Sequence, residues 1–303
     1  MPYPINHITS SARRRSALLW LVLFVIGVAW GATGPLSKLA VSTGNHPVGV
    51  AFWGTVIGAS VLTVGLLLSG KRLPLGRRNL VFFLICGFLG TALPNSLSYM
   101  AYEHLPVGVM AICIALGPMA TLLIALPLGI EQPDHRRLIG LGLGAVAVLL
   151  IVLPESGLPE PDQAAWVALP VIVSLAYATE NVYIATARPP GLDTLTIMCG
   201  LTWGALILLT PVLVASDAWF DITRLGPPEQ AIIANSALHI GAYFCFIWLI
   251  GQAGPVFASQ VGYVVTSSGV ILGIIIYGER HSSWVWLALV LMFAGLILVN
   301  PKR

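Results

Sequence analysis

The chain has 303 residues, of which 57% are hydrophobic and only 9% are charged, whereas a soluble protein of this size carries about 25% charged residues. Its 15 Lys and Arg and 12 Asp and Glu leave a net charge of +3, which is too weak a bias to indicate a nucleic-acid partner. These proportions exclude an ordinary soluble enzyme and a disordered protein. They indicate a chain whose solvent is mostly the lipid bilayer.

Apolar runs follow one another along the chain, and a bilayer core needs about 20 such residues per helix. The first run begins after Arg15 and is too long for the apolar part of a cleaved signal peptide. The connections are short, so the sequence predicts an all-α integral membrane protein with a single domain over 1–303. Ten transmembrane helices are expected at 17–42, 47–70, 79–103, 106–129, 135–154, 164–187, 194–215, 229–252, 255–278 and 283–300.

The cations predict the orientation of these helices. With the N-terminus inside, the outer loops hold only Arg224 and Arg280. The inner segments hold twelve cations: Arg13, Arg14, Arg15, Lys71, Arg72, Arg77, Arg78, Arg136, Arg137, Arg188, Lys302 and Arg303. Cytoplasmic loops of membrane proteins carry such an excess of Lys and Arg. We therefore expect a multi-pass protein of the cytoplasmic (inner) membrane with both termini in the cytoplasm.

The chain also contains an internal repeat. The stretch from Leu105 and the stretch from Gly254 each begin with a proline at a tight turn, Pro106 or Pro255. Each then passes through one span and ends near an acidic residue, Glu131 or Glu279. A half that contains five spans must insert in the opposite orientation to its partner. The sequence thus predicts two inverted five-helix repeats, at about 17–154 and about 164–300.

On these features the chain resembles the EamA-type, ten-helix family of the drug/metabolite transporter superfamily. The residues that carry the resemblance are Gly254-Pro255, Tyr277-Gly278-Glu279-Arg280, Gly295 and Trp30-Gly31. The first half departs from the family, because Gly129-Ile130-Glu131 stands where Gly-Glu is usual. Within the superfamily the chain looks like the aromatic amino acid exporters of the YddG type. The resemblance implies a central substrate cavity between helices 1, 3, 4, 6, 8 and 9, peripheral helices 5 and 10, and alternating access.

Polar side chains recur at helical spacing in five spans, and offsets of three, four and seven or eight place each set on one helix face. Polar groups are costly in lipid and face a cavity or the interior of a bundle, so a shared cavity and plain interhelical hydrogen bonding both remain open. The residues expected to bind substrate are Trp30, Asn95, Tyr99, Tyr102, Tyr177, Glu180, Asn181, His239, Tyr243, Gln260, Tyr263 and Ser267. For each aromatic residue among them, core packing is the alternative.

Only a few ionisable groups lie within the spans. At about 1.5 Å per residue, Lys38 lies roughly 12 Å from the middle of its span, so it is expected to extend its amine to the membrane surface. Glu180 lies roughly 6 Å from the middle of its span and His239 within roughly 3 Å. Glu180 is a candidate to bind an amino group or to carry a proton, and His239 is either a titrating group or a neutral, hydrogen-bonded core histidine.

Four positions are candidate hinges, because proline frees backbone carbonyls and glycine loosens a helix. They are Pro35, Pro94, Pro118 and Gly269, and a static kink is the alternative for each.

The predicted function is secondary transport of a small organic solute, an amino acid in the first place, by an exporter that needs no cofactor and no metal. A proton is one candidate for the coupling ion. The alternatives are an exporter of another metabolite or drug class, a passive channel, or an intramembrane enzyme. An enzyme is disfavoured because the spans carry no paired catalytic groups and no motif such as G-x-S-x-G.

Overall fold

A computed structural model describes residues 6–130, 134–152, 161–253, 258 and 260–299. These residues form helices and connecting turns, with no strand among them. Seven helical stretches in the described chain are long and apolar enough to cross a membrane, and two shorter apolar helices cover Val261–Tyr277 and Ser283–Leu298. The all-α membrane fold expected from the sequence is confirmed. Pro255 and Glu131, which helped to reveal the repeat, lie outside the described residues.

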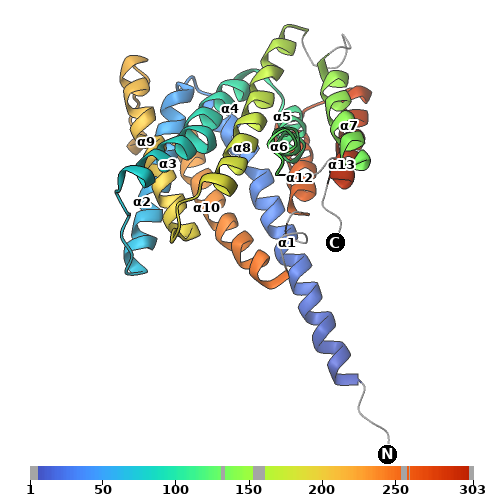
Figure 1. The fold of residues 1–303 in the computed structure, drawn as a ribbon. Coiled ribbons are helices and arrows are strands. Elements are labelled where there is room, and N and C mark those ends of the chain that lie inside the picture. Colours follow the sequence, from blue (N-terminus) through green and yellow to red (C-terminus); the bar gives the residue numbers. More distant parts are fainter. Residues whose placement is uncertain (1–5, 131–133, 153–160, 254–257, 259, 300–303) are drawn as a thin grey trace, which may run out of the picture.

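The helices of the first half follow the predicted spans (Figure 1). They are α1 (Asn6–Val41), α2 (Pro47–Leu68), α3 (Arg77–Gly87), the π-helix η1 (Phe88–Ala92), α4 (Leu93–His104), α5 (Val107–Ile114), α6 (Gly117–Ala125) and α7 (His135–Val152). The second half contains the 3₁₀-helix η2 (Pro161–Val167), α8 (Ala168–Ala187), α9 (Thr194–Ala215), the 3₁₀-helix η3 (Ile222–Arg224), α10 (Pro227–Ala253), α12 (Val261–Tyr277) and α13 (Ser283–Val299).

Two spans differ from the continuous helices that the sequence predicted. The predicted span 79–103 contains the π-helix η1 directly before Pro94. The predicted span 106–129 breaks at Ala115 and Leu116, before Pro118, and its helix ends at Ala125. Proline has no N–H to donate to the carbonyl four residues earlier. Each interruption therefore lies where a proline removes a hydrogen bond of the helix.

Local sequence explains where several helices begin and end. Pro47 occupies the first turn of α2, where no N–H is needed, and His46 accepts a hydrogen bond from the Val48 N–H. Asp193 caps α9 by accepting from the Thr196 N–H at 2.8 Å. Gly278 ends α12 with a left-handed φ of 64°, a conformation that glycine adopts at little cost.

The two halves interlock across the whole bundle. Helix α1 packs on α10 and α12, and the corresponding helix of the second half, α8, packs on α4 and α6. Contacts between α2 and α9, between α5 and α12, and between α7 and α13 each join equivalent helices of the two halves. This pattern is unchanged when the halves are exchanged, as expected for two related repeats. Helices α7 and α13 lie side by side at one edge, as peripheral helices should (Figure 1).

Glycine permits the closest approaches between the halves. A Cβ added to Gly31 of α1 would overlap Ser268 of α12. A Cβ added to Gly87 of α3 would overlap the α9 backbone near Ala205. Small residues at such crossings let helix backbones approach closely in a membrane, so these two contacts fix α1 against α12 and α3 against α9.

The bundle has two ends, which are named here by a residue at each. The Lys38 end contains the C-terminus of α1 and the turns at 42–46, 105–106 and 278–282. The Arg77 end contains the turns at 69–76 and 188–193, which Lys71 and Asp193 join by an ion pair of 2.5 Å. Helix α1 runs from the Arg77 end to the Lys38 end (Figure 1).

Candidate functional site

Three helices meet at a hydrogen-bonded polar layer inside the bundle. The Asn235 amide of α10 donates to the Tyr99 hydroxyl of α4 at 3.1 Å and to the Ser37 hydroxyl of α1 at 3.3 Å. Tyr102, one turn after Tyr99, is buried, and its hydroxyl lies beside Gly34 of α1. The structure therefore brings the polar faces of α1, α4 and α10 together, and most of the polar atoms in this layer are paired.

A second layer lies about two helical turns further toward the Arg77 end. The Trp30 ring of α1 lies 6.1 Å from the His239 ring and 5.2 Å from the Phe246 ring of α10, measured between centroids. Tyr243 lies between these two residues on the same face of α10, because offsets of four and three residues share a helix face. His239 is exposed although it lies mid-span. Trp30, His239 and Tyr243 thus form one aromatic wall.

Glu180 of α8 lies opposite this wall. Its carboxylate rests against Gly90 in the π-helix η1, where an added Cβ would overlap it. Tyr177 lies three residues before it on the same face of α8. Glu180 is only half-buried, and among the described residues it has no hydrogen-bond or ion-pair partner. A carboxylate without a partner at this depth is costly, which makes Glu180 a candidate ligand-binding group.

Five polar side-chain atoms are buried without a hydrogen-bond partner in the described chain, and two of them belong to these layers: the Trp30 indole nitrogen Nε1 and the Asn235 amide oxygen Oδ1. Buried polar atoms are normally hydrogen-bonded, so each such exception calls for a physical explanation. One atom is a donor and the other an acceptor. We call the two layers together the interior polar site, which comprises Trp30, Ser37, Tyr99, Tyr102, Tyr177, Glu180, Asn235, His239 and Tyr243.

The interior polar site does not include five of the residues expected to bind substrate. The Tyr263 ring packs on Phe293 of α13 at 5.7 Å, and Ser267 donates to the carbonyl of Tyr263 in its own helix. The remaining three are placed by their helices only. Asn95 lies one turn before Tyr99, the exposed Asn181 follows Glu180, and the half-buried Gln260 precedes α12.

The candidate hinges differ from one another in structure. Pro118 follows the break in its span, and Ser174 of α8 donates to the Cys113 carbonyl at 2.9 Å, beside the Ile114 carbonyl that Pro118 leaves free. Ser174 therefore satisfies backbone at the break and is not directed at a cavity. Pro94 follows the π-helix η1, and Pro35 lies within the continuous α1. Gly269 lies in the continuous α12, close against Ala111 of α5.

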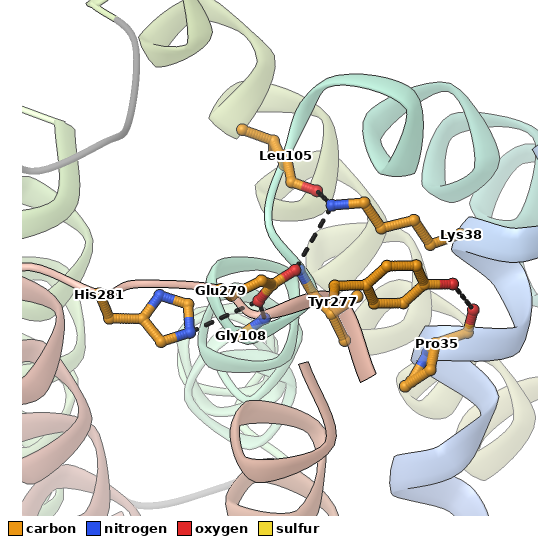
Figure 2. A network of polar contacts seen from close by, with 8 residues as sticks. Pro35, Lys38, Leu105, Gly108, Tyr277, Glu279 and His281 are labelled. Carbon is orange, nitrogen blue, oxygen red and sulfur yellow. Dashed lines mark hydrogen bonds and ion pairs between the residues drawn. The ribbon is translucent and has the colours of Figure 1, made fainter. Parts of the chain in front are cut away.

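A network of buried charges joins the two halves at the Lys38 end (Figure 2). Glu279, whose side chain is 7% exposed, pairs with Lys38 of α1 at 3.4 Å. The same carboxylate accepts hydrogen bonds from the N–H groups of Val107 at 2.6 Å and Gly108 at 3.1 Å. These N–H groups belong to the first turn of α5, where a negative charge is stabilised. We call this arrangement the Lys38–Glu279 network.

Neighbouring contacts extend the Lys38–Glu279 network. Lys38 also donates to the Leu105 carbonyl at 3.2 Å, and the Tyr277 hydroxyl donates to the Pro35 carbonyl at 2.8 Å. His281 Nε2 lies 3.4 Å from Glu279. Burial lowers the pKa of His281, the Lys38 charge lowers it further, and Glu279 opposes both effects.

The sequence analysis missed this network, because it expected the Lys38 amine to reach the membrane surface. Instead, the amine turns to Glu279 and the Leu105 carbonyl. The predicted topology contained a signal for the pairing. Apart from Arg136 and Arg137 at the start of one span, Lys38 is the one base within a span, and Glu279 follows a span that ends on the same side of the membrane.

An open cleft of about 550 Å³ lies at the Arg77 end between α3 and α8. Arg77 and Arg78 line it, together with the stacked rings of Phe82 and Tyr183, whose centroids are 5.7 Å apart. In the described part of the chain, no three His, Cys, Asp or Glu side chains gather as a metal site would require.

Known proteins with similar sequences match most of the length of this chain. The chain is 26% identical to the inner membrane transporter YedA of Escherichia coli over 294 residues, which are 93% of this chain and 90% of YedA. It is 19% identical, over 95% of its length and 94% of the relative, to a protein of Streptantibioticus cattleyicolor named as a probable terminal-alkyne amino-acid exporter.

PecM of Dickeya dadantii is 26% identical over 78% of each chain. A solved crystal structure with 17% sequence identity has the same fold, with a TM-score of 0.59 over 93% of this chain and 96% of that one. The EamA-like transporter family matches residues 16–153 and again residues 164–300, in agreement with the two repeats. The chain therefore belongs to the EamA-like transporter family.

Proposed function

We propose that the protein is a secondary transporter that exports amino acids across the cytoplasmic membrane by alternating access. The observation that carries this proposal is the interior polar site, to which α1 and α4 of one half and α8 and α10 of the other contribute. A site formed between two related halves becomes accessible from one side or the other when the halves move. The alternative of plain interhelical bonding explains the Ser37–Tyr99–Asn235 layer, but it does not explain Glu180.

The contacts between the halves support one access state. Toward the Lys38 end, the halves are joined by the Lys38–Glu279 network and by the bonds of Asn235. Toward the Arg77 end, an open cleft lies between α3 and α8. Buried polar atoms without a hydrogen-bond partner in the described chain occur at both ends, among them Trp30 Nε1 and His281 Nε2, so the two ends differ in how the halves are joined. We therefore infer a state that is closed at the Lys38 end and accessible from the Arg77 end.

The charge distribution indicates which side of the membrane the accessible end faces. Because Lys and Arg are concentrated in the segments that share a side with the N-terminus, the Arg77 end is the cytoplasmic end in our proposal. The cleft lined by Arg77, Arg78 and Tyr183 then faces the cytoplasm, where an exporter collects its substrate. One relative is named as an amino-acid exporter, which is consistent with this direction. The narrower resemblance to aromatic amino acid exporters of the YddG type stays a prediction.

The proposal is tested by flux in proteoliposomes. The purified full chain is reconstituted, and exchange of labelled amino acids is measured against empty liposomes. We expect saturable exchange that unlabelled substrate competes away. Absence of exchange for every amino acid, combined with exchange of another metabolite class, would reject the substrate. Flux that rises linearly with concentration would instead indicate a channel.

Proton coupling is tested in the same preparation. If Glu180 carries the coupled proton, Glu180→Gln removes the pH dependence of exchange while the chain still folds. A pH dependence that persists in this variant would exclude Glu180 from that role and turn attention to His239.

A further inference from the structure

We propose that Glu180 binds the ammonium group of the substrate, and that the site selects for this ammonium group and not for the carboxylate. The inference rests on the proposed function and narrows its substrate class. Amines and amino acid derivatives with a masked carboxylate should bind at least as well as the parent amino acids. Acids that lack the ammonium group should not bind.

The first argument is the inventory of formal charges. Apart from Arg136 and Arg137 at the start of one span, Lys38 is the one base within the spans, and the Lys38–Glu279 network already uses its charge. Within the interior polar site, Glu180 is the one acid and no Lys or Arg is present. A substrate carboxylate would therefore enter a low-dielectric region that contains a negative charge and no fixed positive charge, which is unfavourable. An ammonium group would instead find an unpaired carboxylate.

The second argument is the surroundings of that carboxylate. Tyr177 lies three residues before Glu180 on the same face of α8, and Tyr243 lies on the face of α10 that carries His239. Aromatic rings and hydroxyl oxygens both favour a cation. Gly90 leaves room for the carboxylate at the π-helix η1 because it has no side chain. The unpaired Asn235 Oδ1 is a further acceptor in the site.

Two groups in the site, the Trp30 Nε1 and His239, favour a carboxylate over an ammonium group. The Trp30 Nε1 is an unpaired donor, but it is neutral and compensates a carboxylate only in part. His239, which faces Trp30, is the other titratable group of the site outside the tyrosines. A protonated His239 would supply a positive charge for a carboxylate, so it must be included in the test.

The experiment measures binding by thermal stabilisation of the purified full chain in detergent, so it does not depend on flux. Four ligands with the same phenyl body are compared: L-phenylalanine, its amide, phenethylamine and 3-phenylpropionate. We expect the amide and the amine to stabilise the chain at least as strongly as L-phenylalanine. We expect 3-phenylpropionate to bind at least tenfold more weakly. Equal binding of 3-phenylpropionate, or no binding of the amine, would overturn the inference.

Variants then assign the effect to Glu180. Glu180→Gln should weaken binding of the amine at least tenfold and leave the melting temperature of the ligand-free chain nearly unchanged. Glu103→Gln removes an exposed acid at the end of α4 and serves as the matched control with no effect on binding. Unchanged amine binding in Glu180→Gln would overturn the assignment. Binding of 3-phenylpropionate that disappears in His239→Gln would show that a carboxylate is recognised after all.

The result also separates this inference from the proposed function. Stabilisation by the amine without exchange of any amino acid supports the ammonium site and rejects amino acid export. Exchange of amino acids that 3-phenylpropionate inhibits as well as the amine does supports export and overturns the ammonium site.

Discussion

Two acidic side chains of the bundle, the buried Glu279 and the half-buried Glu180, have opposite surroundings. At the Lys38 end, Glu279 is paired with Lys38 and with two backbone N–H groups of α5. In the interior polar site, Glu180 has no partner within the described chain and lies against Gly90. A buried charge that is fully compensated stabilises one arrangement of the helices. A buried charge that is left uncompensated is suited to binding something that comes and goes.

Breaking the compensated charge should give the largest effect on stability. Glu279→Gln leaves Lys38 without its counter-charge and weakens the cap on α5, so we expect a loss of about 2–3 kcal/mol, at the low side of the usual range because the Lys38 side chain is 26% exposed. Thermal unfolding in detergent measures this loss. The double variant Lys38→Met with Glu279→Gln should recover part of it. If the double variant is less stable than Glu279→Gln alone, the ion pair is not the source of the loss.

A smaller stability effect should follow from removing a neutral buried contact between the halves. Ser174→Ala removes the hydroxyl that donates to the carbonyls of Cys113 and Ile114, and the Cys113 carbonyl keeps the Leu116 N–H as a donor, so we expect a cost of about 1 kcal/mol. Ser96→Ala is the matched control, because the Ser96 hydroxyl bonds only to Ala92 in its own span. Equal melting temperatures for the two variants would show that the break before Pro118 needs no support from α8.

The uncompensated charge can be disturbed without being removed. Gly90→Ala places a methyl group where the Glu180 carboxylate lies. The carboxylate ends a flexible side chain and can move, and alanine favours a helix by about 1 kcal/mol over glycine. We therefore expect a stability change below about 1 kcal/mol but a roughly tenfold higher KM for exchange. A variant that unfolds, or one with unchanged KM, would contradict the placement of Glu180.

The smallest effect is expected for an exposed ion pair. Lys71 and the Thr196 N–H lower the pKa of Asp193 to about 2 from 3.8, so its contribution to stability is full above pH 3.8 and is lost as the pH falls toward 2. Asp193→Asn keeps a capping side chain and removes the charge, so we expect a loss below about 1 kcal/mol. Chemical denaturation at pH 7 and pH 3 measures it. A loss as large as that of Glu279→Gln would contradict the distinction between exposed and buried pairs.

Much of the architecture was predictable because the long apolar runs of membrane helices can be recognised in the sequence. The described helices follow the predicted spans, and the family match divides at the predicted repeats. The depth of Glu180 followed from counting residues along one span. Within α4, the offset of three residues placed Tyr99 and Tyr102 on one face, and both are buried in the bundle.

The features that could not be predicted depend on contacts between residues that are far apart in the sequence. The pairing of Lys38 with Glu279 joins positions 241 residues apart, and hydropathy says nothing about which charges meet. Ser174 lies three residues before Tyr177 on the same helix face, yet it donates to the carbonyls of Cys113 and Ile114 on another helix, and Pro118 leaves the Ile114 carbonyl free. Helical spacing shows which side chains share a face, but it does not show what lies opposite.

The π-helix η1 has a consequence for how such a site changes over evolution. A π turn holds one residue more than the α turn it replaces, so η1 records one extra residue between α3 and α4. Deleting one codon there would restore an α-helix, and the residues on either side would keep their helix faces because the wider turn had absorbed the extra residue. Tyr99 and Tyr102 would then keep their neighbours, and α3 would keep its contact with α9. Gain or loss of a single codon thus reshapes the surroundings of Glu180 beside Gly90 without rearranging the rest of the bundle.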